Sequence, residues 1–346
     1  MKRLVIVLGA LFAIGALVFA GGAAEPVAVE PEDATGTVVW ASANPTPVVE
    51  EIVSRFEARY PQMSVETLYM GAGETLARIQ AEQANPQIDV WSGGDMFTRQ
   101  PVLHLLESYR SVHIDDFPAE YVDTDEYKWY GFSGPSQVFL VNTNLLDEAD
   151  YPRTWSDLAD PKYRGEIIFA NPALSSSAFM QMALMYQVGG WDLVRGVIEN
   201  AVVTPSSRTA WQTVGDGEYA VGIASENSPL SLVHAGYPVE VIFPEDGTNR
   251  SFDVVSIVKN SPNPAGAKLL LDFINSREAH EVIVQPPHFR RSVRPDVEGI
   301  DEMLDADQIS YIEWSEEVEY MMGEGRDEML ETFEDIFAGV DPQIVE

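Results

Sequence analysis

Cysteine is absent from the sequence. None of the 346 residues is a cysteine, so the chain can form neither a disulfide nor a cysteine-linked lipid anchor. Hydrophobic residues make up 45% of the chain, which is ample for packed cores, and the length predicts about two domains. The sequence therefore indicates a globular protein that folds on its apolar cores alone.

Basic residues are also scarce. The chain has 21 Lys and Arg against 55 Asp and Glu, a formal net charge of −34. A surface of this charge repels nucleic acids and anionic membranes, which excludes both as expected partners.

The N-terminus has the pattern of an export signal. Lys2 and Arg3 precede an apolar run over residues 4–20, and small residues follow at 21–24. This order predicts a signal peptide over residues 1–24, with cleavage after Ala20 or Ala24; an uncleaved anchor is the alternative. Residues 25–35 are expected to form a tether. The protein is thus predicted to work in the periplasm or at the outer face of the cytoplasmic membrane.

Strand and helix patterns alternate after the tether. Short apolar strands are predicted at residues 36–41, 63–68 and 87–92, each followed by a helical or loop segment. Such alternation favours an α/β fold with a mainly parallel sheet, whose ligand-binding loops lie at the carboxyl ends of the strands. Candidate ligand-binding residues in these loops are Ser42, Asn44, Gly73, Ser92 and Gly93.

Two later strands, at residues 166–170 and 201–204, are each followed by a serine cluster and a helical pattern. Serine and threonine cap helix N-termini, and a helix start carries partial positive charge that suits an anion. The pattern predicts one concave anion site, although ordinary capping without a ligand is the alternative. Its candidate residues are Ser175, Ser176, Ser177, Ser206, Ser207, Arg208 and Thr209.

Further polar candidates lie beside turns and strand ends. Ser133 and Ser136 flank a Gly-Pro turn, and Glu226 and Asp246 follow apolar strands. We expect the carboxylates to bind hydroxyl groups or an amine on the same ligand, with Asp253 as another candidate.

Several segments together resemble a known family. They read GAGETLARIQAEQANPQIDVWSGGD, FSGPSQVFLVNTNLL, GDGEYAVGIASE and IVKNSPNPAGAKLLLDFINSREAHEVI. In this order they resemble the extracellular solute-binding proteins of ABC importers, in the branch that includes ferric-iron-, phosphonate- and hexose-phosphate-binding proteins.

The resemblance implies a two-lobed, type II periplasmic-binding-protein fold, with a mainly parallel sheet flanked by helices in each lobe. The chain would cross between the lobes near residues 133–138 and 247–254, and these two crossovers would act as a hinge. Lobe 1 would comprise residues 36–135 and 250–290, and lobe 2 residues 136–249 and 291–346.

The resemblance also implies a carrier that delivers a small polar solute to the transmembrane permease of an importer. We expect a monomer without a cofactor. It is not expected to be an enzyme, because the serine clusters lack the Gly-x-Ser-x-Gly setting and no paired-carboxylate or metal signature is present.

Three ligand classes stay open. A phosphate ester or phosphonate is favoured by the serine clusters and Arg208. Ferric iron comes second, because the sequence has no adjacent tyrosine pair and its histidines lack metal-ligand spacing. A polyamine- or thiamine-like cation would follow if the carboxylates dominate the site.

Overall fold

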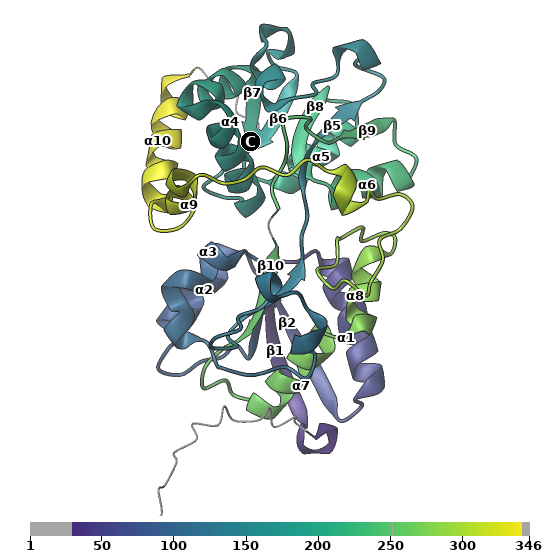
Figure 1. Ribbon diagram of the computed structural model, residues 1–346, viewed down its shortest axis with the longest axis vertical. Helices are drawn as coiled ribbons and strands as arrows, with labels where there is room; N and C mark the ends of the chain where they lie inside the picture. Colours follow the sequence, from purple (N-terminus) through teal and green to yellow (C-terminus); the bar gives the residue numbers. More distant parts are fainter. Residues whose placement is uncertain (1–29, 251, 341–346) are drawn as a thin grey trace, which may run out of the picture.

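Two five-stranded sheets lie at the centres of two lobes, stacked one above the other in Figure 1. The computed structural model describes residues 30–250 and 252–340. The predicted signal peptide and residues 25–29 of the predicted tether lie outside the described residues. Within the described ranges, no helix is long and apolar enough to cross a membrane.

The first sheet has the strand order β2-β1-β3-β10-β4. Its strands are β1 (Gly36–Ser42), β2 (Met63–Tyr69), β3 (Val90–Ser92), β4 (Tyr130–Ser133) and β10 (Asp253–Ile257). β1 pairs in parallel with β2 and β3, whereas β10 runs antiparallel to β3 and β4. β10 enters from the other lobe and so runs against its neighbours. The sheet is therefore mixed rather than mainly parallel.

The second sheet repeats this plan with the order β7-β6-β8-β5-β9. Its strands are β5 (Gln137–Asn142), β6 (Ile167–Ala170), β7 (Ala201–Thr204), β8 (Val221–Ser225) and β9 (Val239–Ile242). β6 pairs in parallel with β7 and β8, and β5, the first strand after the chain enters this lobe, is antiparallel to β8 and β9. β5, β6 and β7 are buried along their whole length, which explains their continuous apolar sequences.

Helices cover both sheets. In lobe 1 they are α1 (Thr46–Arg59), α2 (Ala72–Ala81), α3 (Met96–Arg99), α7 (Pro264–Ile274) and α8 (Arg277–Val284). In lobe 2 they are α4 (Ser176–Asn200), α5 (Ser207–Gly215), α6 (Asn227–His234), α9 (Glu316–Met322) and α10 (Arg326–Gly339). α4 is kinked at Gly190, whose φ of +64° is accessible to glycine. α9 and α10 pack beside α4, and the buried Met322 and Phe333 join the core of lobe 2.

The chain passes between the lobes along three segments. The first lies between β4 and β5 and the second between β9 and β10, close to the expected crossovers. The third runs from α8 to α9 (Figure 1). Val293 and Val297 pack against the core of lobe 1, so lobe 1 extends beyond the expected boundary at residue 290. The tether is also shorter than the predicted range of residues 25–35, because Ala34 is fully buried in the same core.

Candidate functional site

A cleft of ≈ 730 Å³ lies between the lobes. Lobe 1 lines it with residues 43–45, 71–74 and 93–94, which follow β1, β2 and β3. Lobe 2 lines it with residues 172–177 and 205–207 and with three residues near the start of α6. The volume is sufficient for a small-molecule ligand.

Six helices of the described chain begin at this cleft: α1 and α2 from lobe 1, and α4, α5, α6 and α10 from lobe 2. At α4, Ser175 accepts a hydrogen bond from the Ala178 N–H, and at α5, Ser206 accepts one from the Arg208 N–H. The caps of α1, α2 and α6 make no such side-chain bond. Helix starts leave backbone N–H groups without internal partners and carry partial positive charge, so the cleft is suited to anionic oxygens.

Two arginines also line the cleft. The guanidinium of Arg326, at the start of α10, lies 3.7 Å from the centroid of the Phe179 ring. Burial lowers the pKa of Arg326. Within the described part of the chain, this guanidinium has neither a hydrogen bond nor an ion pair. It is therefore a cation at the cleft wall that makes no direct ion pair in the described residues, although the charges of Asp95 and Asp327 act on it.

The second arginine, Arg290, has partners. It donates to Ser133 Oγ at 2.6 and 2.9 Å and forms an ion pair with Asp253. Burial raises the pKa of Asp253, and the charge of Arg290 opposes that rise. Asp253 and the exposed Glu74 are the carboxylates on the described cleft wall.

Half of the sequence-predicted site residues line the cleft. These are Asn44, Gly73, Gly93, Ser175, Ser176, Ser177, Ser206 and Ser207. Ser175 and Ser177 hydrogen-bond to each other through their hydroxyl groups at 3.0 Å. The predicted residues of lobe 1 and the two serine clusters of lobe 2 thus line the same cleft.

Ser42 and Ser92 lie directly behind the wall. Both are buried, and their hydroxyl groups are 2.9 Å apart. Ser92 also accepts from Asn44 Nδ2 at 3.2 Å, so these serines orient a side chain that does line the cleft.

Ser133, Ser136 and Glu226 belong to the hinge. Glu226 is fully buried, accepts two hydrogen bonds from Arg291 at 2.7 and 2.8 Å, and accepts another from the Ser136 N–H at 3.0 Å. Its carboxylate is thus occupied by the protein, contrary to the expectation that it would meet the ligand in the cleft.

Arg208, Thr209 and Asp246 do not line the cleft either. Arg208 is exposed at the outer side of the start of α5, whose inner side packs through Ala210 and Val214. Asp246 is exposed and accepts from the backbone N–H of Trp155 at 3.0 and 3.2 Å, so it caps another turn.

Sequence reasoning missed Arg290 and Arg326. One signal was available for Arg326: it is the only base between residues 301 and 335, a strongly acidic stretch. An isolated cation there favours a specific contact over a solvated helix face.

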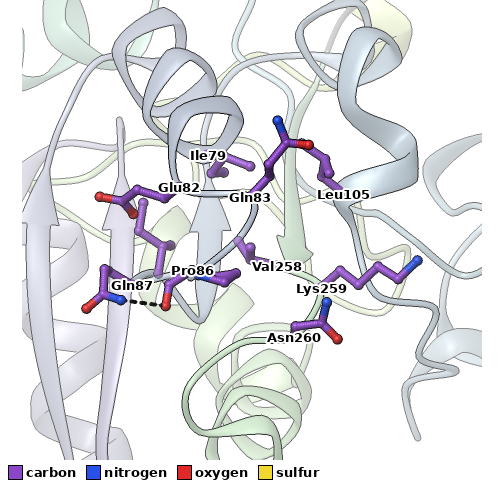
Figure 2. Close-up of a pocket in the computed structure, with 10 residues that line it drawn as sticks. Ile79, Glu82, Gln83, Pro86, Gln87, Leu105, Val258, Lys259 and Asn260 are labelled. Carbon is purple, nitrogen blue, oxygen red and sulfur yellow. Dashed lines mark hydrogen bonds between the residues drawn. The ribbon is translucent and has the colours of Figure 1, made fainter.

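A second cavity lies at the far side of lobe 1, between α2 and the end of β10 (Figure 2). It measures ≈ 30 Å³ and is lined by residues such as Ile79, Leu105 and Val258. That volume holds little more than a water molecule, so it is no alternative site for a solute.

Metal ligands are poorly represented. Within residues 30–250 and 252–340, no group of three or more His, Cys, Asp or Glu could hold a metal ion. The cleft-lining residues of the same ranges include no tyrosine and no histidine.

Comparison with known proteins assigns the family. The family model for bacterial extracellular solute-binding proteins matches residues 86–289. The chain belongs to this family. It is a non-enzymatic solute-binding protein of an ABC importer.

Similar proteins support this assignment. An uncharacterized protein of Haemophilus influenzae is 30% identical over 260 residues, covering 71% of this chain and 74% of the relative. Iron uptake protein A1 of Synechocystis is 24% identical over 255 residues, covering 68% and 70%. The solved structure of the periplasmic binding protein AfuA from Actinobacillus pleuropneumoniae, with exogenous fructose-6-phosphate bound, has a TM-score of 0.79 at 27% identity and covers 88% of this chain and 99% of AfuA. The predicted type II fold is thereby confirmed.

Proposed function

We propose that this solute-binding protein captures a phosphate ester or phosphonate in the interlobe cleft and delivers it to the permease of its importer. It would act as a monomer in the periplasm or at the outer face of the cytoplasmic membrane. The observation that carries the proposal is the guanidinium of Arg326, which makes no hydrogen bond or ion pair within the described residues, in a cleft where six helices begin.

These groups match the chemistry of a tetrahedral anion. A phosphoryl or phosphonyl group presents three acceptor oxygens, which the backbone N–H groups and hydroxyls of residues 175–177 and 206–207 can satisfy. Hydrogen bonds to a charged group contribute about 1.5–3 kcal/mol each. The net charge of −34 opposes binding only weakly, because charges beyond about 8–10 Å are screened.

The remaining lining groups would bind the rest of the ligand. Asn44, Gly73 and Gly93 from lobe 1 offer hydrogen-bonding groups, and Asp253 offers an acceptor for a hydroxyl or an amine. We propose supporting roles for Ser42 and Ser92, which hold Asn44.

Ferric iron is the second candidate, because the Synechocystis relative is named as an iron uptake protein. The cleft offers it little, since Asp253 is already paired with Arg290 and Glu74 is exposed at the rim. A polyamine-like cation ranks third, because Arg326 would repel it.

A thermal-shift screen of ligand-stripped protein tests the proposal. The probes are fructose 6-phosphate, 2-aminoethylphosphonate, ferric ion, spermidine and thiamine. A ligand at ~100 times its dissociation constant adds about 2.7 kcal/mol, which raises Tm by several degrees. We expect such a shift with a phosphate or phosphonate probe, and a shift with ferric ion or a cation alone would contradict the proposal.

Arg326→Ala is the decisive variant, with Arg208→Ala as its matched control. Loss of a charge-assisted contact of about 2–3 kcal/mol should weaken binding of the anionic probe by roughly 30- to 150-fold in Arg326→Ala. Arg208→Ala removes the same charge outside the cleft and should bind within about twofold of wild type. Equal affinities in the two variants would remove Arg326 from the site.

A further inference from the structure

A buried arginine lies behind the lobe 1 wall of the cleft. The side chain of Arg99, at the end of α3, is fully buried, and its guanidinium stacks 3.2 Å from the centroid of the Trp91 ring. Its Nη2 donates to the backbone carbonyls of Gly93 at 2.9 Å and Val254 at 3.0 Å. No carboxylate in the described residues forms an ion pair with it. A buried cation held by neutral carbonyls is costly, so a role beyond packing is expected.

Two carboxylates act on the charge of Arg99. They are Asp95 and Asp253. Asp253 is paired with Arg290, and Asp95 also attracts Arg326, which belongs to lobe 2. These two carboxylates are therefore shared with other arginines, and the buried charge of Arg99 is only partly offset. Positive charge in a poorly solvated region attracts an anion in the adjacent cleft more strongly than surface charge does.

The bond from Arg99 also fixes the direction of a peptide group. Gly93 and Gly94 both line the cleft and have φ angles of +89° and +75°. In a planar trans peptide the C=O and the following N–H point in opposite directions. Because the Gly93 carbonyl points inward to Arg99, the Gly94 N–H points outward, to the cleft side. Within the described ranges this N–H makes no hydrogen bond to the protein.

Close contacts make this arrangement specific to glycine. A Cβ at Gly93 would lie 2.7 Å from Ala43 Cβ, and one at Gly94 would lie 2.8 Å from Ala72 Cβ. Together with the positive φ angles, these distances hold the Gly93–Gly94 backbone at the wall, with its donor unobstructed by a side chain.

We propose that Arg99 is a positioning residue for anion binding: it holds the Gly93–Gly94 peptide so that the Gly94 N–H meets an anionic ligand oxygen, and it supplies positive charge behind that donor. The inference rests on the proposed binding of a phosphate ester or phosphonate. It adds a donor from lobe 1 that faces the serine clusters and Arg326 of lobe 2, so that an anion would bridge both lobes.

The test separates charge from packing. Calorimetric titrations with fructose 6-phosphate and 2-aminoethylphosphonate are made at pH 5 and pH 7.5, because a phosphate monoester passes from monoanion to dianion near pH 6. The proteins are wild type, Arg99→Gln, Arg99→Lys and the surface control Arg208→Gln, each checked for folding by circular dichroism.

We expect Arg99→Gln to weaken binding about tenfold at pH 7.5 and about threefold at pH 5, so that preference for the dianion falls about threefold. Arg99→Lys retains the charge and should retain the preference. A loss in Arg99→Gln that is equal at both pH values would indicate a packing role and overturn the inference, while the proposed function would stand. Failure of wild type to bind either probe would overturn both.

A measurement on the wild-type chain covers the case in which Arg99→Gln does not fold. In ¹⁵N NMR spectra, the amide proton of Gly94 should shift downfield when fructose 6-phosphate is added, as expected for a new charge-assisted hydrogen bond. The amide of Gly165, which has a similar positive φ in lobe 2 and lies outside the cleft lining, should not shift. An unchanged Gly94 signal at saturation would contradict the inference.

Discussion

At the scale of single residues, the position of charge in the cleft depends on side-chain direction. Arg208 is beside a serine cluster in sequence, yet it is exposed on the outer side of α5. Arg326 is far from that cluster in sequence, yet the third interlobe segment brings it to the same space. Local pattern predicted that the serines would cap helices, because capping is a local interaction, but it could not predict contacts made through chain connectivity.

Glu226 illustrates a second limit of the sequence. Its position after an apolar strand correctly indicated a strand end, but its partner Arg291 is 65 residues away. A carboxylate that is fully buried requires a partner, and nothing in the local sequence shows which basic residue supplies it.

His280 gives a prediction for stability. It is fully buried between the rings of Phe117 and Phe132, and burial lowers its pKa to about 3. Below its ordinary pKa of about 6.5, the unfolded chain binds a proton that the folded chain does not, so the free energy of unfolding falls as the pH falls. Between pH 7 and pH 5 this residue should cost about 2 kcal/mol.

Urea unfolding at the two pH values measures this effect. The loss of stability between pH 7 and pH 5 should be smaller by about 2 kcal/mol in His280→Gln than in wild type. His104 is exposed, so His104→Gln should leave the loss unchanged. An identical loss in all three proteins would show that His280 takes up its proton in the folded state.

At the scale of elements, the alternation of strands and helices predicted most of the site. Each parallel strand delivers the start of a helix to the same edge of its sheet, which explains why loops after β1, β2, β6 and β7 meet at one cleft. The antiparallel strands β5 and β10 were not anticipated, because strand direction depends on the crossovers and not on local pattern.

Helix α3 carries a contact between the lobes. Phe97 belongs to lobe 1, yet it packs against the core of lobe 2, with its Cδ1 3.3 Å from the position of a Cβ at Gly323, in the turn between α9 and α10. Figure 1 shows α3 below α9 on one side of the molecule. This contact holds the lobes together at the side of the cleft.

Phe97→Ala should therefore favour an open arrangement of the lobes. Loss of a half-buried ring removes about 1 kcal/mol, so binding of the anionic probe should weaken about fivefold and the radius of gyration of the unliganded protein should increase. Val112→Ala trims an exposed apolar side chain of lobe 1 and serves as the control. An unchanged radius and affinity in Phe97→Ala would show that this contact does not govern closure.

At the scale of the whole molecule, the hinge joins three chain segments through neighbouring arginines. Arg290 binds Ser133 and Asp253 on the side of lobe 1, and Arg291 binds Glu226 on the side of lobe 2. The two-lobed fold and its two expected crossovers were predictable from the resemblance of ordered motifs. The third segment, which carries these arginines, has no periodic pattern from which a crossing could be predicted.

The central claim is that the cleft selects its solute by an anionic phosphoryl or phosphonyl group. Isothermal titration calorimetry of ligand-stripped protein with matched pairs tests it most directly: fructose 6-phosphate against fructose, and 2-aminoethylphosphonate against 2-aminoethanol. The account predicts that the anionic member of at least one pair binds 100-fold or more tighter than its uncharged or cationic counterpart, about 2.7 kcal/mol. Equal affinities within both pairs, or binding of ferric ion while all four compounds fail to bind, would contradict it.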